Sequence, residues 1–454
     1  MQTFSNIKSL IEDKKFSQIK SILMEMEPYD IAEALRPVED KDALIIFRLL
    51  PKELAAETFV EFDTERRHDW IKSLSDKELG NILAELFVDD TVDIVEEMPA
   101  NIVKRILTNC DADTRKEINE ILRYPPNSAG SIMTTEYVSL RPAMSVAEAF
   151  VRIKEVGKDK ETLEIFFVTD NQRKLLGCLT VRNLILASMD AVVGDIMDKS
   201  VVTVSTTEDR EFVAKKMANY NFTVIPIVDK ENRLVGIVTA DDVIDVITQE
   251  ATEDIHLMAA VAPNDEPYLM TSVWVHWRKR IVWLLVLMVS GVLTGLIINK
   301  YEAMFATLPL LVAFLPRLMG TGGNCGAQSS TLIIRGLALD ELHPRDVFKI
   351  MAKELTVALL VGIALALANT PILWILYGFE YGNTVWWLCL SYGITIVVVV
   401  VIAKLLGCTL PLLAKKCHLD PALMASPIIT TLVDVLSVLT FFVIANAIVF
   451  PHLV

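Results

Sequence analysis

The spacing of apolar and polar residues changes twice along the chain. In residues 1–130, apolar residues recur every three or four positions over short stretches such as 43–50, which predicts consecutive amphipathic helices. Pro51 and Pro99 follow two such stretches and suit the first turn of the next helix. A series of short helices, each with one apolar face, predicts an all-α, superhelical N-terminal domain.

An internal repeat follows this helical region. Residues 168–180 match residues 227–239 at a constant offset of 59, and Ser131-Ile-Met133 corresponds to Asp195-Ile-Met197. Each copy predicts a leading strand, a helix, two strands joined by a turn, and a final helix. The repeat resembles a pair of CBS domains, which implies one compact α/β sensory module.

The last part of the chain is dominated by long apolar stretches. Five of them are long enough to cross a hydrocarbon core of ~30 Å as helices that rise ~1.5 Å per residue. They lie at about 281–298, 305–334, 355–377, 386–413 and 427–450. The chain is therefore predicted to be a multidomain membrane protein with a five-helix transmembrane domain. Its predicted parts are the helical domain (1–130), the tandem CBS domains (131–250, divided into 131–193 and 194–250), a connecting helix (251–273) and the transmembrane domain (274–454).

Charge is distributed unequally between the two halves. The chain has a net charge of −15, yet residues 274–454 hold only 8 acidic residues and 12 basic ones. The remaining 50 acidic and 31 basic residues make the first half acidic, which disfavours nucleic acid as a partner and attracts cations. Basic residues of the second half cluster in alternate loops, as in Arg278-Lys-Arg280 and Lys415-Lys416. The positive-inside rule then places the N-terminal half in the cytoplasm and the C-terminus outside.

One carboxylate, Asp434, lies inside the last apolar stretch. An unpaired carboxylate in a bilayer costs several kcal/mol or more, so it points to a cation path. The alternative is a structural acid that is protonated or paired with a base, for which Arg317 is the candidate. Thr430, Asp434 and Ser437 recur at spacings of four and three, so they form one polar stripe on the predicted helix.

The second apolar stretch contains four glycines within residues 320–326. Such a sequence permits either close helix packing or a locally opened backbone whose carbonyls line a water-filled cavity. Asn324 and Gln328 add oxygen-bearing side chains that suit a hydrated cation. Near the last stretch, Pro427 is expected to leave a backbone carbonyl free to join the polar stripe, and Asp420 to mark the inner mouth of a path.

Acidic residues are dense in the N-terminal half. Glu61 belongs to one group, and the run 89–97 carries five acids, for each of which a solvated helix face is the simplest interpretation. After the repeat, Asp242, Asp245 and Glu253 fall on one helical face if the segment is continuous. Carboxylates so placed repel one another unless a divalent ion or a neighbouring base lies between them. This pattern indicates a cation-sensing switch.

The resemblance to CBS domains also implies an adenosine nucleotide, such as ATP, as a ligand. Members that bind one use Thr-x-x-Asp after the last strand, where the Asp contacts the ribose. Copy two has Thr239-Ala-Asp-Asp242, whereas copy one has Thr180-Val-Arg-Asn183. Phe222 and Arg182 could stack on the base and contact phosphates. The alternative is CBS packing without a nucleotide.

Taken together, the motifs are similar to those of full-length bacterial MgtE-family magnesium channels. Residues 320–324, 328–338, 419–423 and 427–434 carry the resemblance, as does the order of domains over the whole chain. It implies a homodimer in the bacterial cytoplasmic (inner) membrane, with a Mg²⁺-selective pore on the two-fold axis and Asp434 of each subunit at the central site. The pore residues that it implies are Gly322, Gly323, Asn324, Gln328, Pro427 and Thr430.

The same resemblance implies that cytoplasmic Mg²⁺ holds the pore shut by binding between the helical domain, the CBS pair and the connecting helix. Without the ion, the acidic faces separate and the connecting helix moves away from the pore. Asn221 occupies a position where some members have an acid. Together with Glu61 and Asp420, the implied Mg²⁺ ligands are Asp89, Asp90, Asp93, Asp209, Glu211, Asp242, Asp245, Glu250, Glu253 and Asp254.

Two other functions fit parts of this pattern. A proton- or sodium-coupled exporter of divalent cations would also need an intramembrane acid. A nucleotide sensor that is merely anchored in the membrane would explain the CBS pair. An enzyme is not predicted, because the sequence has neither a P-loop nor a recognisable set of nucleophile, base and oxyanion donors.

Overall fold

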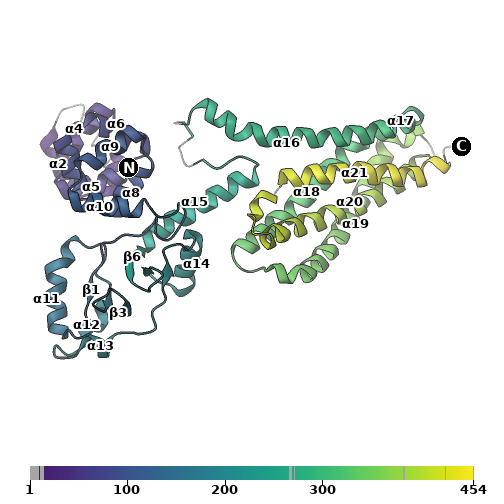
Figure 1. The fold of residues 1–454 in the computed structure, drawn as a ribbon. Coiled ribbons are helices and arrows are strands. Elements are labelled where there is room, and N and C mark those ends of the chain that lie inside the picture. The colour runs from purple at the N-terminus through teal and green to yellow at the C-terminus, as the bar shows by residue number, and fades with distance from the viewer. Residues whose placement is uncertain are drawn as a thin grey trace. The chain divides into compact units, whose positions relative to one another are not determined.

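The computed structural model describes residues 10, 15–264, 268–269, 271–381, 384–424 and 426–452. The chain divides into two compact units, Met1–Glu250 and Ala251–Val454. Each unit contains apolar cores of its own, and Figure 1 labels the helices and strands that build them.

Short helices form the beginning of the first unit. Alternate helices pack on each other, α3 on α5, α5 on α7 and α7 on α9, so the chain advances as a superhelix. The core they share includes Phe47 and Trp70, whose ring centroids lie 4.9 Å apart. The predicted all-α arrangement is confirmed. The helices are α2 (Phe16–Leu23), α3 (Pro28–Leu35), α4 (Asp40–Phe47), α5 (Lys52–Val60), α6 (Thr64–Ser73), α7 (Asp76–Leu83), α8 (Val88–Glu96), α9 (Ala100–Asn109) and α10 (Ala112–Ile121).

Two three-stranded sheets with equivalent topology follow. In each sheet the first strand is parallel to the second, and the second is antiparallel to the third. The strands are β1 (Ser139–Leu140), β2 (Ile165–Thr169) and β3 (Leu175–Thr180), then β4 (Val204–Ser205), β5 (Val224–Val228) and β6 (Leu234–Thr239). The helices around them are α11 (Val146–Val156), η1 (Gly157–Asp159), α12 (Val181–Leu186), α13 (Val193–Ile196) and α14 (Arg210–Tyr220).

The two copies are related by contacts that repeat at the same offset as the sequence. The Leu175 N–H donates to the Asn232 carbonyl, and the Leu234 N–H donates to the Arg173 carbonyl. Leu175 and Leu234 are 59 positions apart, and so are Arg173 and Asn232. In the first bond copy one donates to copy two, and in the second bond copy two donates to copy one. The predicted pair of similar α/β modules is therefore confirmed.

The leading segment of each copy pairs with the last strand of the other copy. Thr134 exchanges two backbone hydrogen bonds with Ile237 of copy two, and Asp198 exchanges two with Cys178 of copy one. The glycine of each last strand makes room for this contact, since a Cβ at Gly236 would lie 2.7 Å from the Met133 sulfur. The repeated Gly and Ile-Met motifs thus describe one interlocking contact, made twice.

The helix that leaves copy two is α15 (Ala240–Met258), which is continuous from Asp242 past Glu253. It ends well before residue 273, so the predicted extent of the connecting helix is wrong. The cause is a left-handed C-terminal turn in which Ala260 has φ 55°. There the N–H groups of Ala260 and Val261 donate to the Leu257 and His256 carbonyls, each at 2.9 Å, which closes the helix end.

The second unit is a bundle of long helices. α20 contacts α18, α19 and α21, and α16 packs on α21. Figure 1 shows α17 and the last turns of α21 at the same end of this bundle. The helices are α16 (Val273–Lys300), α17 (Glu302–Thr307), α18 (Leu311–Ala338), α19 (Val347–Tyr381), α20 (Thr384–Lys416) and α21 (Ser426–Ile448), with the 3₁₀ turns η2 (Pro344–Asp346), η3 (Pro421–Met424) and η4 (Phe450–His452).

Four segments among the described residues are long and apolar enough to cross a membrane: Val273–Lys300, Pro344–Phe379, Thr384–Lys416 and Pro421–His452. α18 is not one of them. Its 28 residues would extend ~42 Å as a helix, but its glycines and polar side chains lower the hydropathy. The fifth of the predicted spans therefore stays a prediction.

The glycine-rich segment of α18 is an uninterrupted helix that packs closely on its neighbours. A Cβ at Gly322 would lie 2.7 Å from a methyl carbon of Val433, and one at Gly326 would lie 2.6 Å from a methyl carbon of Ile429. The glycines were expected to permit either close helix packing or an opened backbone, and the structure shows close helix packing. The backbone of α18 is not opened.

Candidate ion path and acidic interface

α18 has two opposite faces. The glycine face is buried against α20 and α21, whereas Arg317, Asn324, Gln328 and Arg335 are exposed. At ~100° per residue these four side chains fall within about 40° of one another around the helix. A stripe with two arginines and two amides is unsuited to lipid, so it needs water or another protein surface beside it. We call these four residues the α18 polar stripe.

Two of the predicted pore residues do not belong to this stripe. Gly322 and Gly323 lie on the buried face, where a Cβ at Gly323 would collide with the Thr430 side chain. Their assignment to a pore lining is therefore not supported by their packing within one chain. Their contact brings the polar residues of α21 next to α18.

Asp434 is half-buried on α21. The neighbouring members of its polar stripe face α18, since Thr430 contacts Gly323 and Ser437 is fully buried beside Gly322. Among the described residues, Asp434 forms no hydrogen bond or ion pair, so Arg317 does not neutralise it within the same chain. The structural alternative of an Arg-paired acid is thus not realised here.

Pro427 and Asp420 have local roles in the structure. Pro427 lies in the first turn of α21, where a helix loses no hydrogen bond to proline. Its own carbonyl accepts bonds from the hydroxyls of Thr430 (3.3 Å) and Thr431 (3.2 Å). Because a proline in the first turn frees no carbonyl of the helix, the carbonyl expected to join the polar stripe is not supplied in this way. Asp420 accepts a bond from the Ala422 N–H at 2.7 Å and thereby caps η3.

In the first unit, the start of α8 faces acids of the CBS pair. The carboxylate of Glu136 accepts a hydrogen bond from the Val88 N–H at 2.9 Å and so caps α8. Acids on α8 lie within electrostatic range of Glu161 and of the start of α15. We call this group the acidic interface. It comprises Asp89, Asp90, Asp93, Glu136, Glu161, Asp241 and Asp242, with Glu61 and Asp245 at its margin.

Burial and mutual repulsion make these acids hard to ionise together. Loss of surrounding water raises the pKa of Asp93 to about 7, although part of the residue stays exposed, and repulsion from Asp242 and Asp90 adds to it. Burial, with repulsion from neighbouring acids, raises the pKa of Glu161 to about 8. For the same reasons the pKa values of Asp90 and Asp242 rise to about 6, and that of Asp89 rises well above its ordinary value. The interface is therefore short of positive charge.

Two arginines near the interface already have carboxylate partners, and Lys160 lowers the pKa of Glu136 alone. Arg67 is buried and pairs with Glu97 at 2.5 Å, and Arg210 pairs with Glu250 at 2.8 Å. Both arginines lower the pKa of acids near them, but neither balances the interface as a whole. Protonation of the acids and binding of an external cation are the remaining ways to neutralise it.

The interface fits a hydrated ion rather than a fully chelated one. Within the part of the chain that the structure describes, no three His, Cys, Asp or Glu side chains converge closely enough to hold a metal ion. Mg²⁺ gives up its waters reluctantly and is commonly bound through one or two carboxylates. The acids of α8 and α15, which lie within electrostatic range of one another, are carboxylates of the kind that such an ion binds through its waters.

Three predicted ligands have other partners. Asp209 accepts a bond from the Glu211 N–H at 2.8 Å and caps α14, while Glu211 pairs with Lys215 at 2.7 Å. Glu250 is held by Arg210. The structure therefore does not bring Asp209, Glu211 or Glu250 into the acidic interface.

Three further positions were considered in the prediction of Mg²⁺ ligands. One of them has a backbone role, and the other two lie in the second unit. Asn221 ends α14 with φ 52°, a left-handed conformation that asparagine tolerates better than most residues. This explains the amide at that position without a ligand role. Glu253 and Asp254 follow on α15 but belong to the second unit.

Several charged residues of interest were missed by sequence reasoning. Glu136, Glu161 and Asp241 join the acidic interface, although Glu136 and Glu161 are isolated in the sequence and gave no signal. Lys404 and Glu354 form a buried ion pair in the second unit. Lys404 could have been found, since it interrupts an apolar stretch that was predicted to span the membrane.

The three predicted nucleotide-binding residues are not joined by any contact among the described residues. Asp242 accepts a bond from the Thr239 hydroxyl at 2.7 Å and faces the acidic interface. Phe222 stacks on Tyr220 with ring centroids 5.3 Å apart. Arg182 is exposed on α12 of the other copy.

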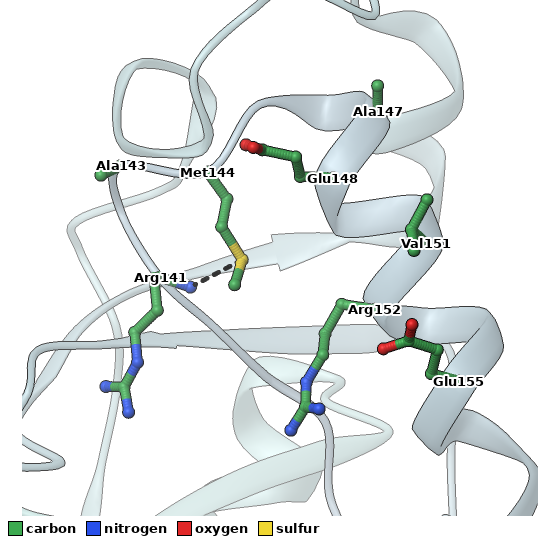
Figure 2. A pocket seen from close by; sticks show the side chains of 8 residues that line it. All are labelled: Arg141, Ala143, Met144, Ala147, Glu148, Val151, Arg152 and Glu155. Atoms are coloured by element: carbon green, nitrogen blue, oxygen red, sulfur yellow. Dashed lines mark hydrogen bonds between the residues drawn. The ribbon is translucent and has the colours of Figure 1, made fainter.

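A shallow groove lies beside α11 in copy one, and Figure 2 shows its side chains. Arg141 donates to the Thr169 carbonyl at 3.1 Å, and Glu148 closes a capping box with Ser145. These charges serve local structure, so nothing marks the groove as a ligand site. It is lined by Arg141, Ala143, Met144, Ala147, Glu148, Val151, Arg152 and Glu155.

The fold and these sites together define a membrane-spanning protein whose N-terminal half combines a helical domain with a CBS pair. Family models agree with this description. The model "Divalent cation transporter" (MgtE) matches residues 315–444, "MgtE intracellular N domain" matches 8–127, and "CBS domain" matches 129–190 and 193–249.

Curated relatives and solved structures point to the same family. The chain is 36% identical to the magnesium transporter MgtE of Thermus thermophilus over 97% of both chains, and 29% identical to that of Bacillus subtilis over 96% and 95%. Its first half is similar to the cytosolic domain of the Mg²⁺ channel MgtE in complex with ATP. That match has 35% identity and a TM-score of 0.51, and covers 54% of this chain and 99% of the other. The chain belongs to the MgtE family of divalent cation transporters, which is not a family of enzymes.

Proposed function

We propose that the protein carries Mg²⁺ across the membrane as a homodimer, with α18 and α21 of the two copies lining the path. The observation that carries this proposal is the α18 polar stripe, which is exposed on one chain and belongs to the helix that packs on α21, the helix of the half-buried Asp434. A second copy would cover the stripe and enclose water against it. The named function of the relatives, magnesium transport, supports the choice of ion.

Within such a path, hydrated Mg²⁺ passes without losing all of its waters. Asp434 from two copies supplies a charge of about −2, and Asn324 and Gln328 offer amide oxygens to the hydration shell. Thr430, one turn before Asp434, and the Pro427 carbonyl that its hydroxyl contacts belong to the same inner part of the path. This donor set favours a hard cation over a soft one.

The orientation of the protein in the membrane follows from the distribution of its basic residues. We place the N-terminal half in the cytoplasm and the C-terminus outside, in the cytoplasmic (inner) membrane of a bacterium. α18 then serves as the fifth crossing, which is tolerated despite its polar stripe because that face meets the second copy.

The acidic interface is proposed to sense cytoplasmic Mg²⁺ and close the path. With Mg²⁺ bound, α8 and the start of α15 stay together, and without it their carboxylates repel each other. The candidate ligands within the interface are Asp89, Asp90, Asp93 and Asp242. Limited trypsin digestion of the full-length protein tests this, with the expectation of slower cleavage of the first unit in Mg²⁺ than in EDTA. Equal cleavage in both conditions would contradict gating at this interface.

ATP binding at the CBS pair is proposed from the relative whose cytosolic domain was solved with ATP, together with Thr239 and Asp242 in copy two. Binding of ATP to the full-length protein, measured by titration calorimetry, should be lost in Asp242→Asn and kept in Asn183→Asp. Equal binding by wild type and Asp242→Asn would place the nucleotide elsewhere.

Transport itself is tested with the purified protein in liposomes. Mg²⁺ should enter down its own gradient with no proton or sodium gradient present, and should do so faster when the Mg²⁺ concentration on the cytoplasmic side is low. Entry only against an opposing proton or sodium gradient would instead indicate a coupled exporter. No flux under any gradient, with ATP binding intact, would indicate a membrane-anchored nucleotide sensor.

A further inference from the structure

Three polar side chains meet in the interior of the second unit, one from each of three helices. The Lys404 ammonium on α20 donates to the Ser329 hydroxyl on α18 at 3.1 Å, and that hydroxyl donates to Glu354 Oε2 on α19 at 2.6 Å. The Lys404 nitrogen lies 3.6 Å from the same carboxylate oxygen. We call these residues the Lys404 triad.

The triad is deeply buried. Ser329 is 0% exposed, Lys404 is 5% exposed, and the Glu354 side chain is 13% exposed. Removing two charges from water costs several kcal/mol per ion, and a buried ion pair often stabilises a fold less than apolar residues of the same size would. A charged pair inside helices that cross a membrane is therefore a candidate for a functional role.

The triad lies beside a close approach of α18 and α20. One turn before Ser329, a Cβ at Gly326 would lie 3.2 Å from the Ala403 carbonyl, and Gly407 leaves room for the Gly326 carbonyl itself. Ala403 and Gly407 flank Lys404 on α20. Backbone contact therefore fixes the distance between the two helices, while the triad fixes their rotation, because its hydrogen bonds are directional.

Ser330, the next residue of α18, forms a hydrogen bond to a different part of the second unit. The Ser330 hydroxyl donates to the Met424 carbonyl at 3.1 Å, in the turn η3 that precedes α21. Adjacent hydroxyls thus attach α18 both to α19 and α20 and to the start of the helix that carries Asp434. Rotation of α18 would move Asn324 and Gln328, which lie on its opposite face.

We infer that Lys404, Ser329 and Glu354 are positioning residues that set the rotation of α18 and thereby the placement of its polar stripe relative to Asp434. This inference rests on the proposed Mg²⁺ path. It predicts that loosening the triad changes which cation passes, because discrimination between Mg²⁺ and the larger Ca²⁺ depends on fixed ligand spacing. A purely structural triad would instead change only the amount of folded protein.

The test uses two variants of the full-length protein in liposomes. Ser329→Ala removes one hydroxyl and leaves the ion pair, and Lys404→Met/Glu354→Gln removes both charges at nearly constant volume. Lys353→Met, an exposed lysine next to Glu354 in sequence, is the matched control. For each, the uptake rates of Mg²⁺ and Ca²⁺ are measured per folded protein, with folding judged by monodispersity and thermal midpoint.

We expect both triad variants to fold and the ratio of Mg²⁺ to Ca²⁺ uptake to fall by about fivefold or more, with the control unchanged. A ratio within about twofold of wild type in folded variants would overturn the inference. Loss of folded Ser329→Ala would also overturn it, since the triad would then be needed for the fold and not for one helix rotation. Absence of Mg²⁺ uptake by wild type would instead contradict the proposed function.

Discussion

The two units of this protein hold buried charge in opposite ways. In the first unit, carboxylates of α8 and α15 gather with Glu161 while nearby arginines are engaged elsewhere. In the second unit, Glu354 has an ammonium group beside it and a hydroxyl that bonds to it. The first arrangement lacks a cation, whereas the second contains its own.

This difference determines what each region can do. A cluster that depends on an external ion changes its stability with the concentration of that ion, so it can act as a switch. A cluster that carries its own counter-charge is costly to separate, since either partner alone would be a buried, unpaired charge. The first unit is therefore suited to sensing, and the ion pair of the second unit is suited to holding helices in place.

Asp434 is the exception that provides the strongest test of this contrast. It lies in the second unit yet resembles the acids of the first, because no hydrogen bond or ion pair to it is formed among the described residues. Asp434→Asn keeps the shape and removes the charge from both copies of a dimer. We expect Mg²⁺ uptake in liposomes to fall by about 10- to 100-fold.

Glu341→Gln, at an exposed acid between α18 and η2, is the control for this loss of charge. It should transport like wild type. Uptake by Asp434→Asn at the wild-type rate would mean that Asp434 is a structural acid and that the path runs elsewhere.

Packing should matter as much as charge in the second unit. Gly326→Ala would place a methyl group 2.6 Å from Ile429 and 3.2 Å from the Ala403 carbonyl. We expect a loss of about 1–3 kcal/mol of stability, seen as a lower thermal midpoint in detergent. Gly295→Ala on α16, where no atom lies within 4 Å, is the control and should not lower it. An unchanged midpoint in Gly326→Ala would show that α18 can shift to make room.

Much of the fold could be predicted, because it depends on local patterns. The spacing of apolar residues indicates the short helices of the first unit, and the offset of 59 indicates two equivalent modules. The exchange of leading segments could not be predicted, since Met133 contacts Gly236 across 103 positions and no local pattern records the partner. The early end of α15 was also missed, because it depends on a positive φ at Ala260, where glycine is more usual.

The candidate sites divide in the same way. Asp434 and the acids of α8 stand out in sequence, as an acid in an apolar stretch and as a dense acidic run. The two faces of α18 follow from helical spacing once the helix is known to be continuous, which composition left open. Glu161 and the partner of Lys404 could not be found, because each depends on tertiary contacts between distant segments.

The pH dependence of the first unit sharpens the contrast further. Because the pKa values of Asp93 (about 7) and Glu161 (about 8) are raised in the interface, the assembled form binds more protons than the separated form. The stability that these bound protons give to the assembled interface is complete below about pH 4 and is lost as the pH rises through 6–8. In EDTA, the thermal midpoint of the first unit should fall by roughly 5 °C or more between pH 5.5 and pH 8.

Saturating Mg²⁺ should reduce this pH dependence, because the ion replaces the protons. The midpoint is measured by calorimetry on the full-length protein, in EDTA and in Mg²⁺ at each pH. If the thermal midpoint changes equally with pH in EDTA and in Mg²⁺, then Mg²⁺ does not bind at the interface.

The smallest expected effect distinguishes repulsion from coordination at a single residue. Asp93→Asn removes one of the repelling charges on α8, so the interface should hold together better without Mg²⁺. In EDTA, we expect trypsin to cleave the first unit about fivefold more slowly than in wild type, as a gain of about 1 kcal/mol would produce. Glu85→Gln changes an exposed acid in the turn before α8, and trypsin should cleave this variant at the wild-type rate. If Asp93→Asn instead needs more Mg²⁺ for protection and gains none in EDTA, then Asp93 acts chiefly as a ligand, and repulsion is not what opens the interface.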